Sequence, residues 1–114
     1  SFNYNSAVLF LAGVGTDLGV GTAAQSITTG QWYHIVTTYD GSSSAGGVKI
    51  YINSASMPLT TYYNNLSSSI QSSQNWQIGN DATSDPLNGV IDEVRIYNRS
   101  LTANEIKQLY NLGR

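Results

Sequence analysis

The sequence contains no cysteine, few charged residues and no long apolar run, and each absence excludes a class of protein. Without cysteine the chain cannot form disulfides, cysteine-ligated zinc sites or a catalytic thiolate. Its five lysine and arginine residues are scattered and its net charge is −2, so we expect neither nucleic acid nor an anionic membrane surface as a partner. No apolar run approaches the roughly 20 residues that span a bilayer, so we expect no membrane insertion.

Serine, threonine, asparagine and glycine take the polar positions that charged residues usually fill. Charged residues make up 11% of the chain, against about 25% in typical soluble domains, and the main aromatic residue is tyrosine, with 8 copies. Apolar residues are plentiful and recur periodically, which argues against disorder. This composition is typical of an all-β domain with many turns.

Alternating apolar and polar residues predict a series of strands. The strongest are residues 32–39, which are rich in β-branched and aromatic side chains, and residues 48–53. In residues 48–53 we expect Val48, Ile50 and Ile52 to point inward. Weaker strands are expected at residues 7–12, 18–21, around 57–59 and at 76–79.

Residues 90–97 predict a long strand with an unusual inner face. Alternation places Val90, Asp92, Val94 and Ile96 on one face, which is apolar except for the aspartate. Because burying a bare charge is costly, the Asp92 carboxylate must be paired, hydrogen-bonded, metal-bound or protonated.

A short C-terminal helix is predicted after this strand. Thr102 and Glu105 have the T-x-x-E spacing of a capping box, and Gly113 stands where a helix stop is expected. The apolar stripe of the helix would consist of Ile106, Leu109 and Tyr110.

Four blocks of the sequence carry a family resemblance. They are G-Q-W-Y-H-I-V-T-T-Y-D-G at 30–41, V-K-I-Y-I-N at 48–53, W-Q-I-G-N at 76–80 and G-V-I-D-E-V-R-I-Y-N-R-S-L-T-A-N-E-I at 89–106. In this order they resemble the bacterial laminin G-like jelly-roll domain of the concanavalin A-like lectin/glucanase superfamily. The resemblance implies an all-β fold, an antiparallel β-sandwich of the jelly-roll type with one short C-terminal helix. The sequence departs from the family at Ser54, where glycine is usual.

Domains of that family usually have strands in front of the matched blocks. We therefore expect residues 1–114 to be a single laminin G-like domain that corresponds to the C-terminal portion of a typical one. Three interpretations are open. The chain is a fragment, or a shortened but self-sufficient sandwich, or it is completed by a strand from a partner chain.

The resemblance also suggests structural calcium. In the related laminarinase-type glycoside hydrolases, an aspartate in a similar late D-x-V-R-V-Y strand is a calcium ligand, which implies Asp92 as a metal ligand here. Asp81, which shares a loop with Asn80 and Asp85, is a second candidate metal ligand. Under the alternative interpretations, Asp92 accepts backbone amide hydrogen bonds and fixes a loop, and residues 80–88 form a solvated polar turn.

We expect no enzymatic activity. Glycoside hydrolysis needs two carboxylates that flank one bond, and the hydrolase relatives carry theirs in an E-x-D-x-x-E strand that is absent here. Asp92 and Glu93 would point to opposite faces of a strand, and Glu105 is engaged in helix capping. His34, the single histidine, is expected to be a hydrogen-bonded core residue.

A binding surface is predicted from aromatic and polar side chains that point outward. The candidate ligand-binding residues are Tyr51, Tyr97 and Arg95 on strands, and Tyr62 and Tyr63 on a loop. Aromatic rings stack on sugar rings, while amide and charged groups bond to hydroxyls. Alternatively, the tyrosines pack on a two-sided sheet and the charged residues form modest cross-strand pairs.

These observations predict a non-catalytic extracellular or cell-surface module that binds a glycan or another surface ligand, such as a surface protein. The alternative is a structural subunit or spacer of a surface filament or adhesin. In that case contact between chains, including homo-oligomer contact, is the function.

Overall fold

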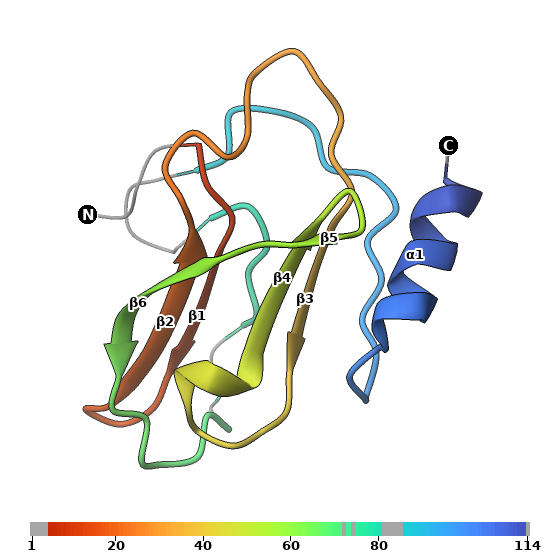
Figure 1. The fold of residues 1–114 in the computed structure, drawn as a ribbon. Coiled ribbons are helices and arrows are strands. Elements are labelled where there is room, and N and C mark those ends of the chain that lie inside the picture. The colour runs from red at the N-terminus through yellow and green to blue at the C-terminus, as the bar shows by residue number, and fades with distance from the viewer. Residues whose placement is uncertain (1–4, 72, 74, 81–85, 114) are drawn as a thin grey trace.

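The described part of the chain contains two three-stranded antiparallel sheets and one α-helix (Figure 1). The computed structural model describes residues 5–71, 73, 75–80 and 86–113. The first sheet has the order β1-β2-β6 and consists of β1 (Val8–Ala12), β2 (Asp17–Thr22) and β6 (Leu59–Asn64). The second has the order β3-β4-β5 and consists of β3 (Ile35–Tyr39), β4 (Val48–Ile52) and β5 (Ala55–Ser56). A 3-10 turn, η1 (Ala45–Gly47), precedes β4, and the helix is α1 (Ala103–Leu112). The predicted fold class is confirmed.

The core lies between the two sheets and is built mainly from β2 and β4. Leu18 and Val20 of β2 cluster with Val48 and Ile50 of β4, and Leu66 joins them from the segment after β6. All five are buried, and Leu18 and Ile50 are 0% exposed. The alternation along residues 48–53 therefore predicted Val48 and Ile50 correctly, while Ile52, the third residue expected inward, is 7% exposed but lies outside this cluster.

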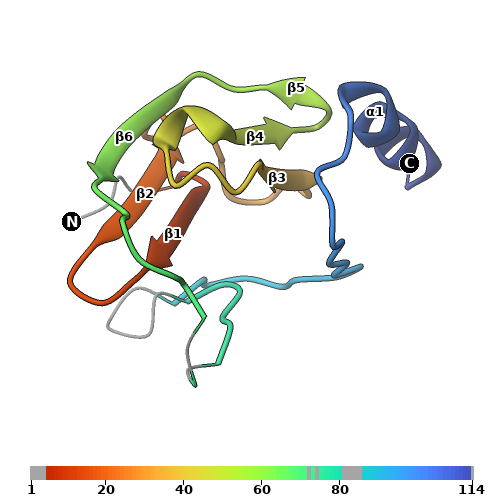
Figure 2. The same cartoon turned by 90° about the horizontal axis from the view of Figure 1, so that it is seen from below.

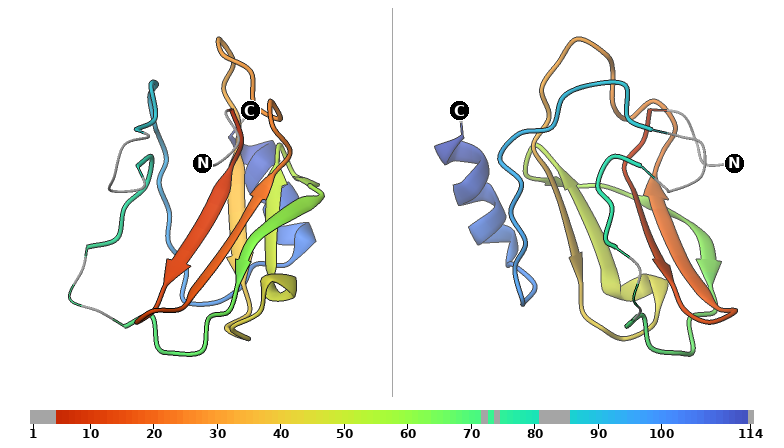
Figure 3. Two further views of the ribbon diagram at one scale, coloured as in Figure 1. Left: turned by 90° about the vertical axis from the view of Figure 1, so that its left-hand side faces the viewer. Right: turned by 180° about the vertical axis from the view of Figure 1, so that it is seen from behind.

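Helix α1 lies beyond the second sheet, on the side away from β1 and β2 (Figure 3). Thr102 Oγ1 accepts a hydrogen bond from the Glu105 amide at 3.2 Å, and Glu105 Oε2 accepts one from the Thr102 amide at 2.8 Å. Ile106 is fully buried, and the Tyr110 ring lies 5.9 Å from the ring of His34 between centroids. The predicted capping box and the inward position of Ile106 are confirmed.

The expectation of a hydrogen-bonded His34 side chain is wrong for one of its nitrogens. Nδ1 is buried and has no hydrogen-bond partner within the described residues. The backbone amide of His34 does donate to Asn53 Oδ1 at 2.9 Å. The imidazole is therefore held by packing against Tyr110, while its main chain is held by the neighbouring turn.

Two predicted strands are absent. Within the described part of residues 65–102, no residue pairs in a sheet, so the strands expected at 76–79 and 90–97 do not form. Glu93 has a φ of 55°, which turns the chain out of the extended conformation, and its amide donates to Asp92 Oδ1 at 2.8 Å. A strand needs a hydrogen-bonding neighbour as well as an alternating pattern, and no described segment pairs with this one.

Residues 86–97 lie instead on the surface. They run past the β1 and β3 side of the molecule, with β5 and β6 on the other side (Figure 2). Val90, Val94 and Ile96, which were expected in the core, are 74%, 56% and 70% exposed, and Asp92 is exposed beside them. The prediction that Asp92 lies on a core face is therefore wrong, because this stretch is not covered by either sheet.

The turn between β4 and β5 contains two residues in the left-handed region. Asn53 has a φ of 50° and Ser54 a φ of 68°. A residue with a Cβ atom pays roughly 1–2 kcal/mol for this conformation, whereas glycine adopts it freely. Ser54 is therefore a point of local strain in an otherwise regular hairpin.

Replacing Ser54 with glycine should stabilise the fold. We expect a gain of about 0.5–1 kcal/mol in the free energy of unfolding, because glycine relieves the left-handed strain but adds freedom to the unfolded chain. Urea denaturation measures the change. Ser56→Gly is the matched control, since Ser56 lies in extended β5 and glycine should weaken a strand there. A loss of stability in Ser54→Gly would contradict the left-handed turn.

Candidate functional site

The five predicted ligand-binding residues lie in three parts of the fold. Tyr62 and Tyr63 lie in β6, not on a loop as expected. Tyr51 lies in β4, while Arg95 and Tyr97 lie in the irregular segment that leads to α1. Because residues 90–97 form no strand, Arg95 and Tyr97 do not share a sheet face with Tyr51.

A β-bulge brings Tyr62 and Tyr63 to the same face of the first sheet. Gly19 of β2 pairs with Tyr63, but the next residue, Val20, pairs with Thr61, so that Tyr62 has no opposite residue in the ladder. An inserted residue interrupts the alternation of side chains. Successive tyrosines, which would point to opposite faces in a regular strand, here both lie on the outer face, away from the core.

Two glycines of β2 make room for these rings. A Cβ atom added to Gly19 would lie 3.0 Å from the Tyr63 ring and 3.2 Å from the Phe10 ring. One added to Gly21 would lie 3.0 Å from Tyr62 Cε2. The rings therefore pack directly against the backbone of β2. A side chain in place of either glycine would push the neighbouring ring away from the sheet.

We call Phe10, Tyr62 and Tyr63 above Gly19 and Gly21 the aromatic face. The Phe10 and Tyr63 rings meet edge to face, with centroids 5.9 Å apart and planes at 77°. Phe10 is 43% exposed and Tyr63 is 48% exposed, so ring surface remains open to solvent. Sequence reasoning missed Phe10. The L-G-V-G alternation at residues 18–21 was the available signal, since glycine within a strand often marks a close approach of other groups.

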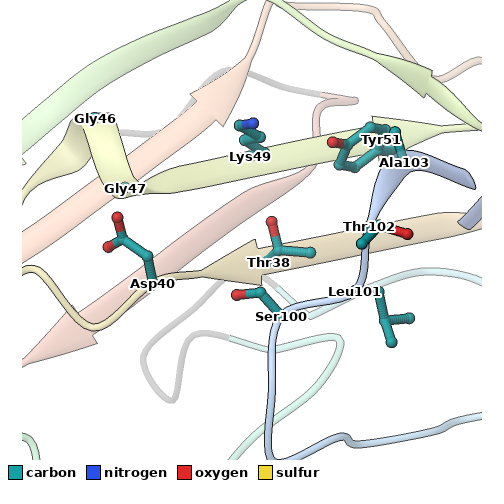
Figure 4. Close-up of a pocket in the computed structure, with 10 residues that line it drawn as sticks. All are labelled: Thr38, Asp40, Gly46, Gly47, Lys49, Tyr51, Ser100, Leu101, Thr102 and Ala103. Atoms are coloured by element: carbon teal, nitrogen blue, oxygen red, sulfur yellow. The ribbon is translucent and has the colours of Figure 1, made fainter. Parts of the chain in front are cut away.

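Tyr51 is buried, contrary to the expectation that it is an exposed outward residue. It lies on the outer face of β4 by alternation, yet it is only 6% exposed. The segment that begins α1 covers it: Tyr51 lines a pocket together with residues 100–103, and its side chain lies beside Ala103 (Figure 4). An outward-facing side chain becomes buried where a helix packs over the sheet.

This pocket, which we call the β4 pocket, has a volume of about 270 Å³. Its floor is formed by β3 and β4, and its wall by residues 100–103 (Figure 4). Thr38, Asp40 and Lys49 contribute polar side chains to the floor. The pocket thus combines a carboxylate, an ammonium group and hydroxyl groups in a small space.

A set of hydrogen bonds holds the wall of the β4 pocket in place. Arg99 Nη1 and Nη2 bind the two Glu105 carboxylate oxygens at 2.9 and 3.1 Å. Ser100 Oγ donates to the Tyr39 carbonyl oxygen at 2.9 Å, which ties the segment to β3. The hydrogen bonds from Arg99 and then from the Thr102 amide lower the pKa of Glu105 below its ordinary value.

The candidate calcium ligands do not form a recognisable cation site in the described part of the chain. Asp92 Oδ1 accepts the Glu93 amide, as the loop-fixing interpretation expects, and Asp81 lies outside the described residues. Calcium takes six to eight oxygens. No group of three or more acidic or histidine residues suited to a metal occurs among the residues described. The calcium hypothesis stays a prediction.

Stability should depend on pH through Glu105. Because its pKa is lowered in the folded state, the stabilisation is present at neutral pH and is lost as the pH falls through the lowered pKa. We expect Glu105→Gln to lower the melting temperature at pH 7 and to flatten the fall of melting temperature as the pH drops below the ordinary pKa of glutamate. Calorimetry over this range measures both.

Glu93→Gln serves as the control for this measurement. Glu93 meets Arg95 at 3.5 Å with its side chain 76% exposed, and surface pairs of this kind contribute little. The variant should keep the pH profile of the parent chain. A Glu105→Gln profile that matches the parent would contradict the role assigned to the Arg99–Glu105 pair.

Comparison with known proteins supports the architecture. A laminin G family model described as "Concanavalin A-like lectin/glucanases superfamily" matches residues 2–107. No curated protein matches the chain significantly. Among solved structures, the chain is similar to an S-layer domain-containing protein (residues 221–444) from Clostridium thermocellum ATCC 27405, with a TM-score of 0.52 and 24% identity. The similarity covers 92% of this chain and 50% of that one, so the chain spans half the length of that structure. At this identity the likeness shows the fold alone.

No helix within the described residues is long and apolar enough to cross a membrane.

Proposed function

Because the chain belongs to the concanavalin A-like lectin/glucanases superfamily, we propose that it is a non-catalytic recognition module that binds glycans in an extracellular or cell-surface setting. The observation that carries this proposal is the aromatic face, where the partly exposed rings of Phe10 and Tyr63 rest on the glycines of β2. The superfamily supports lectin-like binding by analogy, and the aromatic face supplies the chemistry in this chain.

The aromatic face suits the apolar side of a sugar ring. The C–H groups of a pyranose carry partial positive charge, and the face of an aromatic ring carries partial negative charge, so that the two attract when stacked. Thr60, which pairs with Gly21 and is exposed, places a hydroxyl beside the rings for hydrogen bonds to sugar hydroxyls. A site of this kind binds a sugar without cleaving its glycosidic bonds.

The described carboxylates support a non-catalytic role. Glycoside hydrolysis needs two carboxylates facing one bond. Glu105 is bound by Arg99 and Thr102, and Glu93 pairs with Arg95. Asp92 bonds to the amide of its own neighbour, Glu93, on the exposed segment. Each of these three carboxylates is therefore held by a neighbouring group.

Removing the Tyr63 ring should weaken glycan binding. A glycan array with the parent chain identifies bound oligosaccharides. Calorimetry with the best of them should show Tyr63→Ala to bind about two- to tenfold more weakly, since a lost aromatic contact is worth roughly 0.5–1.5 kcal/mol. Tyr63→Phe should retain most of the affinity, because it keeps the stacking surface. Tyr97→Ala is the matched control, since Tyr97 is 44% exposed but lies outside the aromatic face. Absence of any array signal, or equal losses in Tyr63→Ala and Tyr97→Ala, would overturn the proposal.

A second function is favoured by the apolar side chains exposed along residues 76–80 and 86–97. Trp76 is 78% exposed and Val90 is 74% exposed, with further exposed apolar residues between and after them. Where such exposed apolar side chains form one surface, that surface marks contact with other chains. The chain would then act as a structural subunit of a surface assembly, in contact with another copy or a strand-donating partner. The similarity in fold to an S-layer domain-containing protein accords with a surface role.

The structural role predicts self-association that depends on this segment. Sedimentation velocity should show an increase in mass with concentration, and Val90→Lys should reduce it because a charge desolvated at a contact is costly. Val14→Lys is the control, since Val14 is 91% exposed in the turn between β1 and β2. A monomer at all concentrations, or equal effects of the two lysines, would remove this second function.

A further inference from the structure

The β4 pocket lies on the second sheet and has no part in the aromatic face of the first. Its volume of about 270 Å³ is close to the lower end of the roughly 300–1,000 Å³ of small-molecule pockets. It has room for one small ring rather than for a chain of them. Its position beneath the start of α1 gives it a floor of two paired strands and one fixed wall (Figure 4).

Two opposite charges line the pocket without neutralising each other. The ion pairs within the described residues are Arg95–Glu93 and Arg99–Glu105, and neither includes Lys49 or Asp40. Thr38 pairs with Lys49 across the strands, and the Asp40 amide donates to the Gly47 carbonyl oxygen at 3.1 Å. Asp40 and Lys49 are thus diagonal neighbours on one face, a relation in which side chains start roughly 7 Å apart.

The Asp40 carboxylate is held in place by its surroundings. Its Oδ1 accepts a hydrogen bond from the Ser42 amide at 2.9 Å, which closes an Asx turn. A Cβ atom at Gly47 would overlap this oxygen, so only glycine lets the carboxylate rest against the backbone there. The hydrogen bonds from Ser42 also lower the pKa of Asp40, which keeps the group ionised at neutral pH.

The pocket therefore suits a ligand that carries an anionic group at one end and hydrogen-bond donors at the other. An ionised carboxylate accepts hydrogen bonds and donates none, so Asp40 needs donors, while Lys49 donates and needs an acceptor that carries charge. Thr38, which pairs with Lys49 across the strands, adds a hydroxyl to the floor (Figure 4). A six-membered sugar acid has a carboxylate on one side of its ring and vicinal hydroxyls on the other.

We propose that the β4 pocket binds a single hexuronic acid unit, with its carboxylate on Lys49 and its ring hydroxyls on Asp40. A neutral sugar leaves Lys49 without an anionic partner. An inorganic anion offers Asp40 no donor beyond the Ser42 amide and places like charges together. A free amino acid satisfies both charges, and it is therefore included in the test as a competitor class.

The test is a titration of the parent chain, labelled with nitrogen-15 and followed by amide NMR spectra. The probes are D-glucuronate and D-galacturonate, their neutral counterparts D-glucose and D-galactose, and glycine as a simple amino acid. We expect a uronate to shift the amide signals of Thr38, Gly47 and Lys49. The neutral sugars and glycine should bind about tenfold more weakly or not at all. Added sodium chloride should weaken uronate binding, because it screens the ion pair with Lys49.

Variants identify the charge responsible. Lys49→Met keeps the side-chain stem but removes the ammonium group, and should weaken uronate binding by about fivefold or more. Lys49→Arg keeps the charge and should retain most of the binding, which separates loss of charge from loss of fold. Lys107 is an exposed residue of α1. Lys107→Met changes the net charge by the same amount as Lys49→Met and should leave uronate binding unchanged.

Several results would overturn the inference. They are equal binding of neutral sugars, equal or tighter binding of glycine, shifts confined to other parts of the chain, or full binding by Lys49→Met. Each of them leaves the aromatic face untouched, because that site is tested by Tyr63→Ala on oligosaccharides. Conversely, loss of all array binding would not remove a uronate-dependent shift at Lys49.

Discussion

The packing of β2 against β4 is the contact on which the rest of the structure depends. These are the central strands of their sheets, and Leu18 and Val20 on one meet Val48 and Ile50 on the other. Each fully buried aliphatic side chain contributes roughly 1.5–3 kcal/mol relative to an exposed one, so four such residues supply a large part of a domain's stability. The inner faces of the two strands are thereby buried in the core. Only their outer faces can contact a ligand.

The outer faces of these strands carry the two candidate sites. On β2 the outward positions are Gly19 and Gly21. The rings of Phe10, Tyr62 and Tyr63 pack against them. On β4 the outward positions are Lys49 and Tyr51, and the start of α1 covers part of this face. Because both sites rest on strands whose other side is buried, their geometry is fixed by the core rather than by loops.

In the segment between β6 and α1, the structure differs from what the sequence pattern predicts. Residues 90–97 have the alternation of a strand and belong to the part of the sequence matched by the family, yet they pair with no described strand. Strand formation requires a neighbour to take up the backbone N–H and C=O groups, and that neighbour is a property of the whole fold. The left-handed Glu93 and its bond to Asp92 are the local arrangement that the backbone adopts instead.

The sequence by itself determined the all-β class, the capped C-terminal helix and the inward positions of Val48 and Ile50 in β4, because these follow from short-range periodicity and from hydrogen bonds within a few residues. The jelly-roll architecture was implied by the family resemblance instead. It also indicated tyrosines as binding residues. Only the tertiary structure decided which of them share a surface. A bulge in β6 placed Tyr62 and Tyr63 together, and Phe10 joined them from β1. The start of α1 lines one pocket with the buried Tyr51 and the exposed Asp40 and Lys49. These relations depend on register and on packing between distant segments, which alternation along a single strand does not encode.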